Sequence, residues 1–188
     1  SANMEGVDLI VWPETVASRW MPRQMKTLQN SQLDIFPSLS VPLIYGGLTY
    51  EERTQSEMEQ AKSWYGEDQE ALENYMIKRY NSAILRRVDA SIGGIYSKRI
   101  LMPLGEYLPF EDLFPSVRKL SPHSASFTPG DEENVMLAKG KDADFKVAPL
   151  ICYEDLVPSL ARKGAANGAN FFSNLITGAW YGDTQAPY

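Results

Sequence analysis

Cys152 is the side chain best suited to chemistry in this sequence, because a thiolate is a strong nucleophile. It is the only cysteine, it ends the apolar segment Phe145–Cys152, and Tyr153, Glu154 and Asp155 follow it. A cysteine at the carboxyl end of a buried strand would lie at the sheet edge where open α/β folds bind ligands. A helix that begins nearby would favour the thiolate over the thiol. The alternative is a structural cysteine that packs as a small apolar side chain.

Two more charged residues lie at the end of an apolar segment or inside one. Glu14, in Trp12-Pro13-Glu14, follows the first apolar segment, although an acidic residue there could also simply open a helix. Lys98 lies within the apolar segment Ile95–Met102. Lysine is seldom buried without a partner, so this one either has a partner or faces water from an edge strand. Each signal has an ordinary structural explanation, and none identifies a reaction alone.

The elements that would position these residues alternate between strand and helix. Five apolar segments bounded by turn-forming residues are typical of buried strands; they are Val7–Trp12, Val41–Leu48, Ile95–Met102, Phe145–Cys152 and Asn170–Leu175. Helical spacing of apolar residues, or a proline start with a glycine just past the end, predicts three helices; they are Glu14–Gln32, Glu67–Tyr80 and Pro158–Asn167. This alternation predicts one α/β domain over residues 1–188, with long loops at Pro103–Pro115 and Ser121–Gly140.

The composition excludes several classes of function. The chain has 188 residues and a net charge of −6, which argues against nucleic acid as a partner. One cysteine allows no internal disulfide and no cysteine-based zinc site, and the only histidine, His123, is interpreted as a loop residue. No apolar run reaches the roughly 20 residues of a membrane-spanning helix, and no signal segment is apparent.

Taken together, these segments resemble the nitrilase superfamily, and within it the bacterial apolipoprotein N-acyltransferase family. The resemblance spans nearly the whole chain. The motifs that carry it are Trp12-Pro13-Glu14-Thr15, Tyr80-Asn81-Ser82-Ala83, Lys98 with Pro103-Leu104-Gly105-Glu106-Tyr107-Leu108-Pro109-Phe110, Phe127-Thr128-Pro129-Gly130, Ile151-Cys152-Tyr153-Glu154, and Ala179-Trp180-Tyr181-Gly182-Asp183-Thr184 with Ala186-Pro187.

The resemblance implies a fold and a set of site residues. The fold would be a nitrilase-type αββα sandwich, here incomplete and lacking its first and last strands. Glu14, Lys98 and Cys152 would form a catalytic triad in which Glu14 takes the thiol proton and Lys98 stabilises the oxyanion. Lys98 would also lower the pKa of the Cys152 thiol. Further roles are implied for four residues that would orient Lys98, shape the pocket or contact acyl chains, namely Glu106, Tyr153, Glu154 and Trp180.

The resemblance also implies partners and a location. The acyl donor would be a phospholipid, the acceptor would be the N-terminal diacylglyceryl-cysteine of an apolipoprotein, and no metal or organic cofactor would be needed. The domain would lie on the periplasmic side of the bacterial inner membrane, attached through a transmembrane region absent from this chain. Exposed sheet edges would favour a homodimer of such a fragment.

The sequence departs from the family in two places and leaves two alternatives open. Ile176-Thr177-Gly178 replaces the usual Thr-Asn-Asp, and the segment Glu51–Arg79 is longer than the family needs, which suggests an insertion. One alternative is a nitrilase-type amidohydrolase, in which water resolves the thioester. The other is a fragment that is inactive and only folds or binds lipid.

Overall fold

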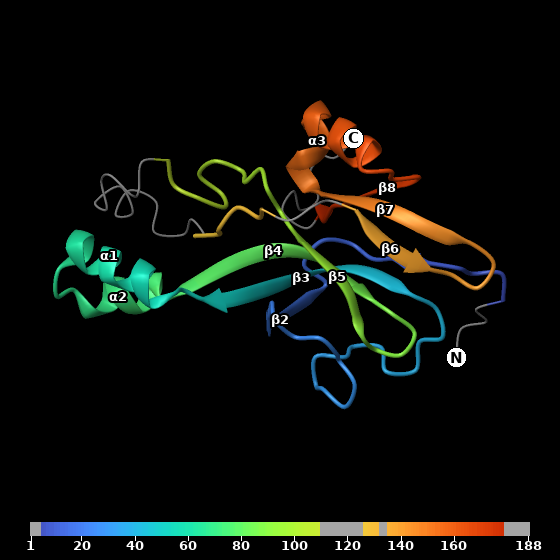
Figure 1. Ribbon diagram of the computed structural model, residues 1–188, viewed down its shortest axis with the longest axis horizontal. Coiled ribbons are helices and arrows are strands. Elements are labelled where there is room, and N and C mark those ends of the chain that lie inside the picture. Colours follow the sequence, from blue (N-terminus) through green and yellow to red (C-terminus); the bar gives the residue numbers. More distant parts are fainter. Residues whose placement is uncertain (1–4, 110–125, 132–134, 179–188) are drawn as a thin grey trace.

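The computed structural model describes residues 5–109, 126–131 and 135–178, which form two β-sheets packed face to face (Figure 1). The first sheet has the order β1-β3-β4-β5, with β2 also pairing with β3. Its strands are β1 (Ile10–Val11), β2 (Ala17–Pro22), β3 (Leu43–Glu52), β4 (Ile77–Arg86) and β5 (Ile92–Ser97). The second sheet has the order β6-β7-β8. Its strands are β6 (Met136–Lys139), β7 (Asp144–Ile151) and β8 (Phe171–Leu175).

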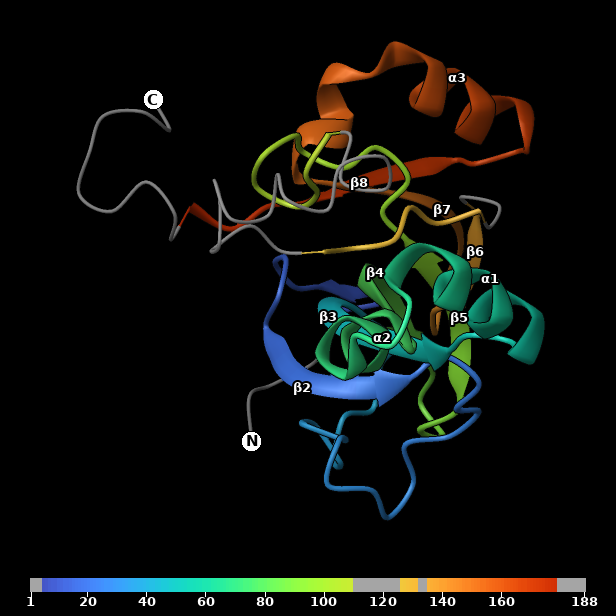
Figure 2. The same ribbon diagram turned by 90° about the vertical axis from the view of Figure 1, so that its left-hand side faces the viewer.

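The main core lies between the two sheets. Ile44 and Tyr96 from the first sheet pack with Val147 and Ile151 from the second, and all four are buried. Because alternate residues of a strand point to opposite faces, β3 turns Ile44 toward this core and its neighbours Leu43 and Tyr45 away from it. Helix α3 (Pro158–Ala166) lies beyond the three-stranded sheet (Figure 2). The expected α/β class is confirmed.

Strands β3 and β4 form the longest ladder, an antiparallel pairing from Leu43 with Arg86 to Glu52 with Ile77. Two helices, α1 (Gln55–Tyr65) and α2 (Gln69–Tyr75), close the end of this ladder and project from the sandwich (Figure 1). A capping box between Thr54 and Glu57 starts α1. This helical pair occupies the segment in which the sequence suggested an insertion. No helix in the described part of the chain is long and apolar enough to cross a membrane.

The helix expected at Glu14–Gln32 is wrong. Residues 17–22 form the parallel strand β2 along β3, and the chain then continues in turns. Met21 and Leu28, whose spacing suggested a helix, are buried against Tyr45 on the outer face of the five-stranded sheet. Strand and turn thus bury the same apolar residues that a helix would have buried.

Three further elements differ from the sequence-based expectation. The expected helix at Glu67–Tyr80 ends at Tyr75, and β4 begins two residues later. Strand β6 lies within the expected loop Ser121–Gly140. The expected strand Ile95–Met102 begins earlier, as β5, and ends at Ser97, so Lys98 directly follows the strand. His123 lies outside the described residues.

Candidate active site

Glu14 lies in a break between two strands that share one edge of β3. Strand β1 pairs with Leu43 and Ile44, strand β2 pairs from Gly47 onward, and the residues between them bulge past Gly46. The Gly46 N–H donates to the Pro13 carbonyl at 3.0 Å. Glu14 is only 7% exposed. The bulge therefore places a carboxylate inside the protein rather than at the solvent.

Gly46 is a residue of this site that sequence reasoning missed. A Cβ atom built on Gly46 would lie 2.5 Å from the Cα of Glu14 and 2.6 Å from the Thr15 nitrogen. Both neighbours are backbone atoms, which cannot rotate away as a side chain could. Glycine is therefore required here by close approach of two chain segments, and its φ is not in the left-handed region.

Lys98 follows β5 and is 2% exposed. Its Nζ lies 2.7 Å from Oε2 of Glu106. The same Oε2 accepts the Met102 backbone N–H at 2.8 Å, and the Glu106 N–H donates to the Met102 carbonyl at 2.9 Å. Contacts within its own loop thus hold the Glu106 carboxylate in place, in addition to its contact with Lys98. A buried lysine is seldom found without a charge-assisted partner of this kind.

Asn81, on β4, connects the two carboxylates. Its Nδ2 donates to Oε1 of Glu14 at 2.7 Å and to Oε1 of Glu106 at 3.0 Å. Its backbone carbonyl accepts the Lys98 N–H at 2.8 Å. The sequence placed Asn81 inside a motif but gave it no role, because its partners lie 67 and 25 residues away.

Cys152 lies at the turn between β7 and a short 3₁₀ helix (Cys152–Leu156). Its φ is +51°, a left-handed conformation that is rare for residues with a side chain. Thr15, next to Glu14, and Leu104, near Glu106, also have positive φ, at 55° and 67°. Among the described residues, three of the five non-glycine residues with positive φ thus lie beside the candidate triad or its lysine anchor. Strain of this kind often marks functional sites.

The electrostatic surroundings of Cys152 differ from the expectation. Burial and the charge of Glu14 raise the pKa of the Cys152 thiol, while Lys98 and the Tyr153 backbone N–H lower it. The net shift is upward from the ordinary value of 9.0, so the expected depression by Lys98 is outweighed. The resting cysteine is therefore a thiol, and its activation needs a proton acceptor. These electrostatic couplings also place Glu14, Lys98 and Cys152 in one neighbourhood.

Glu154 is completely buried behind this turn. Its Oε1 accepts hydrogen bonds from the Tyr96 hydroxyl at 2.8 Å and from the Arg99 N–H at 2.7 Å. Its Oε2 accepts the Ile151 N–H at 2.9 Å. Burial raises the pKa of Glu154, and the backbone N–H groups oppose that shift. Glu154 therefore ties the segment after Lys98 to the cysteine turn, whereas Tyr153 is exposed beside it.

Two buried acceptors in this site lack a hydrogen-bond partner among the described residues. They are Oε2 of Glu14 and Oδ1 of Asn81. Buried polar atoms are rarely left unpaired, and in this cluster of charges an open acceptor is available to a substrate or to a transferred proton. A carboxylate oxygen with a free lone pair, close to a protonated thiol and to a cation, can accept a proton during nucleophilic attack.

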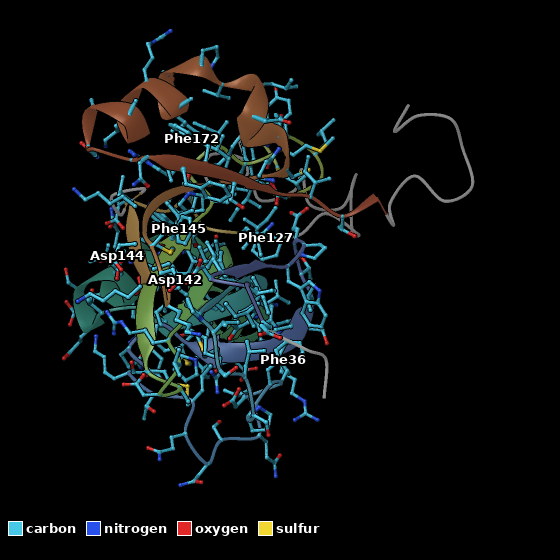
Figure 3. All side chains as sticks on the ribbon, turned by 90° about the vertical axis from the view of Figure 1, so that its right-hand side faces the viewer. Phe36, Phe127, Asp142, Asp144, Phe145 and Phe172 are labelled. Atoms are coloured by element: carbon cyan, nitrogen blue, oxygen red, sulfur yellow. The ribbon has the colours of Figure 1, made fainter. Side chains whose placement is uncertain are left out.

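Apolar side chains flank the charged cluster. Trp20 on β2 packs against Phe127, with ring centroids 6.3 Å apart, and the Phe127 N–H donates to the Glu106 carbonyl at 2.9 Å. Figure 3 shows Phe127 at the level between the two sheets. Met102 and Leu104 in the Glu106 loop are exposed. Trp180, for which a role beside the pocket was expected, lies outside the described residues.

A family model and curated relatives match this chain over most of its length. A family model described as carbon-nitrogen hydrolase matches residues 1–188. An apolipoprotein N-acyltransferase of Bdellovibrio bacteriovorus is 30% identical over 185 residues, covering 96% of this chain and 30% of the relative. One of Rickettsia prowazekii is 27% identical over 188 residues, covering 100% of this chain and 33% of the relative. The chain thus spans about a third of the length of these relatives.

Two solved structures are similar to this chain at low sequence identity. Nit3 of Saccharomyces cerevisiae, a nitrilase superfamily member, has a TM-score of 0.49 at 16% identity, covering 90% of this chain and 51% of that one. A carbon-nitrogen hydrolase of Helicobacter pylori has a TM-score of 0.43 at 20% identity, covering 73% of this chain and 33% of that one. Because the family model matches the chain over its whole length, this chain belongs to the carbon-nitrogen hydrolase family.

Proposed function

We propose that this chain carries the catalytic centre of an apolipoprotein N-acyltransferase, with Glu14, Lys98 and Cys152 as its triad. The observation that carries the proposal is the buried Glu14 Oε2, which has no hydrogen-bond partner among the described residues and lies in the same charged cluster as the Cys152 thiol and the paired Lys98. The relatives named apolipoprotein N-acyltransferase support the choice of acyl transfer over other reactions of the family.

In the first step, a phospholipid ester acylates Cys152. Glu14 takes the Sγ proton while the sulfur forms a bond to the ester carbonyl carbon, and Lys98 stabilises the negative charge on the carbonyl oxygen. The tetrahedral intermediate then loses the lysophospholipid alcohol, which takes the proton back from Glu14. The products are a thioester on Cys152 and a lysophospholipid. Glu106 keeps Lys98 in place through its 2.7 Å contact.

In the second step, an amine resolves the thioester. The α-amine of a diacylglyceryl-cysteine attacks the thioester carbon, Glu14 removes one proton from that nitrogen, and Lys98 again stabilises the oxyanion. The carbon–sulfur bond breaks, and the thiolate of Cys152 takes the proton from Glu14. The products are an N-acylated lipoprotein and the free thiol, so the triad returns to its starting state.

The surroundings of the site suit lipid substrates. The exposed Met102 and Leu104 and the ring pair of Trp20 with Phe127 lie around the Glu106 loop and offer apolar surface for an acyl chain. We place this reaction at the periplasmic face of the bacterial inner membrane, where both substrates would be held. Attachment to that membrane would come from a part of the protein outside this chain, and a homodimer through an exposed sheet edge remains a prediction.

Intact-mass measurement tests the proposal. The protein is incubated with phospholipid vesicles beside its Cys152→Ala variant, and a synthetic diacylglyceryl-cysteine peptide is then added. We expect a hydroxylamine-sensitive mass gain of one acyl chain only in the unchanged protein, and loss of that mass when the peptide becomes acylated. Steady release of free fatty acid without any acceptor would instead indicate the amidohydrolase. No adduct with any phospholipid would overturn the acyltransferase proposal.

A further inference from the structure

A continuous set of polar contacts joins Lys98 to Glu14 across the floor of the candidate site. Lys98 Nζ contacts Glu106 Oε2 at 2.7 Å, and Glu106 Oε1 accepts from Asn81 Nδ2 at 3.0 Å. The same Nδ2 donates to Glu14 Oε1 at 2.7 Å. Asn81 therefore links the carboxylate that holds the lysine to the carboxylate proposed to take the thiol proton.

An amide is well suited to this position. Two carboxylates that approach the same point repel each other unless a donor lies between them, and the Asn81 amide carries two N–H groups without adding charge. Because both neighbours of Nδ2 can only accept while ionised, the amide must present its nitrogen to them and its oxygen elsewhere. Asn81 is 5% exposed, so water cannot easily replace it.

The contact also selects one oxygen of Glu14. Oε1 is occupied by Asn81, while Oε2 has no partner among the described residues. A carboxylate held by one oxygen and fixed in rotation keeps its other lone pairs in a set direction. Without Asn81, the packing beside Gly46 would still fix the backbone of Glu14, but this hydrogen bond would no longer orient its carboxylate.

We propose that Asn81 is a positioning residue that separates the Glu14 and Glu106 carboxylates and aims the free Glu14 oxygen for proton transfer from Cys152. The inference rests on the proposed role of Cys152 as nucleophile, but not on the identity of the acyl donor. In this role Asn81 acts on Glu14 directly and on Lys98 through Glu106.

The test uses p-nitrophenyl acetate, a small activated ester that needs no lipid. The rate of p-nitrophenolate release in a single turnover reports acylation of Cys152 in the unchanged protein and in Asn81→Ala, Asn81→Asp and Ser82→Ala variants. Ser82 is the matched control because it is the next residue of β4, is fully buried, and bonds to Thr49 and Ser97 instead of the carboxylates. Thermal unfolding of each variant checks that it is folded.

We expect Asn81→Ala to slow acylation by about tenfold to a hundredfold, less than the roughly 10²–10⁴-fold contribution of a general base, because Glu14 itself remains. Ser82→Ala should slow it less than about threefold. Asn81→Asp has the same shape but adds a third carboxylate near neutral pH. That new group can replace the amide as a hydrogen-bond donor only when it is protonated. The rate of this variant relative to the unchanged protein should therefore rise as the pH falls from about 8 to about 5.

Several outcomes would overturn the inference. A ratio for Asn81→Asp that does not change with pH would indicate a purely structural role, as would equal losses in Asn81→Ala and Ser82→Ala. An unchanged protein that p-nitrophenyl acetate does not acylate would leave no nucleophile to position. If p-nitrophenyl acetate acylates Cys152 but phospholipids do not, the proposal that a phospholipid is the acyl donor fails. The comparison of the Asn81 and Ser82 variants still tests the role of Asn81.

Discussion

Glu154 and Tyr96 join the two sheets through a buried hydrogen bond of 2.8 Å between carboxylate and hydroxyl. Tyr96 is on β5, and Glu154 follows β7, so the contact crosses the sandwich directly behind the candidate site. Two backbone N–H groups, of Arg99 and Ile100, donate to the same carboxylate oxygen. One side chain therefore sets the spacing between the strand that precedes Lys98 and the turn that holds Cys152.

Replacing Glu154 should destabilise the fold. Glu154→Ala leaves several buried donors without an acceptor, and we expect a loss of about 3–5 kcal/mol in the free energy of unfolding. Tyr96→Phe removes one donor only and should cost about 1 kcal/mol. Urea unfolding followed by tryptophan fluorescence measures both. If Glu154→Ala lowered the free energy of unfolding less than Tyr96→Phe does, this role of Glu154 would be contradicted.

Adding a methyl group at Gly46 should impair the site more than adding one at Gly47. The new Cβ at Gly46 would lie 2.5 Å from the Glu14 backbone, whereas at Gly47 it would meet the end of the Ile84 side chain at 2.9 Å, which can move. We expect Gly46→Ala to slow Cys152 acylation by about a hundredfold, since a displaced base loses its geometry. Gly47→Ala should cost about 1–3 kcal/mol in stability and little in rate. Equal rates for the two variants would contradict this.

The reactivity of Cys152 should rise at unusually high pH. Burial and the charge of Glu14 hold the pKa of the thiol above 9.0, so the rate of iodoacetamide alkylation should keep increasing beyond that pH. Glu14→Gln removes a negative charge and should lower the midpoint pH of the curve of alkylation rate against pH. Lys98→Met removes the positive charge that opposes the shift and should move it up. A midpoint below the ordinary value in the unchanged protein would be contrary evidence.

The buried pair of Asp34 and Arg86 should stabilise the outer face of the first sheet in a pH-dependent way. Burial alone would raise the pKa of Asp34, but hydrogen bonds from Arg86 and from the Phe36 N–H outweigh it, and the net shift is downward. A carboxylate with a lowered pKa in the folded state stabilises above its unfolded value of 3.8 and loses that contribution as the pH falls through the lower folded value.

Unfolding measurements test this pair. Relative to Asp34→Asn, the stability advantage of the unchanged protein should be constant from about pH 7 to about pH 5 and should shrink below about pH 4. Asp34→Ala leaves the guanidinium of Arg86, which is 1% exposed, without its partner and should cost about 3–5 kcal/mol. The double variant Asp34→Leu with Arg86→Met should recover part of that loss. An advantage that grows toward acid would have the wrong sign.

The ring pair beside the Glu106 loop should influence long acyl chains. Trp20→Ala removes a large apolar contact from Phe127, so acylation by p-nitrophenyl esters should lose about tenfold with a twelve-carbon chain and little with acetate. Trp64→Ala, on the projecting helix α1, is the control for loss of an exposed tryptophan. The same loss at all chain lengths would indicate damage to the fold rather than loss of an acyl contact.

Sequence patterns predicted the elements whose local signals and tertiary environment agree. The apolar run Phe145–Cys152 became β7 with the cysteine at its end, and proline at the start and glycine past the end located α3. Strand β4 was not predicted because its first residues fell within the expected helix Glu67–Tyr80. The charged Lys78 and Arg79 near its start have partners in the helical pair, Glu57 and the Asn74 carbonyl. Its strand character depends on pairing with β3, which the local sequence does not encode.

Two parts of the site could not be predicted from the residues alone. Gly46 is needed only because the chain around Glu14 crosses it, and that crossing depends on the parallel pairing of two short strands with one edge. Asn81 lies between Tyr80 and Ser82 in a strand, and nothing in that local sequence distinguishes it from other polar strand residues. Its importance comes from two carboxylates that are distant in sequence and meet only in the folded chain.

The α1–α2 pair enters and leaves the sandwich through a single ladder step, because Glu52 pairs with Ile77. A shorter or longer connection between Glu52 and Ile77 would leave the residue pairs of the β3–β4 ladder unchanged. The tip is therefore a place where related chains can differ in length during evolution without a shift in strand register. It is equally a place where an affinity tag or a fluorescent reporter can be inserted while Gly46 and Asn81 keep their neighbours.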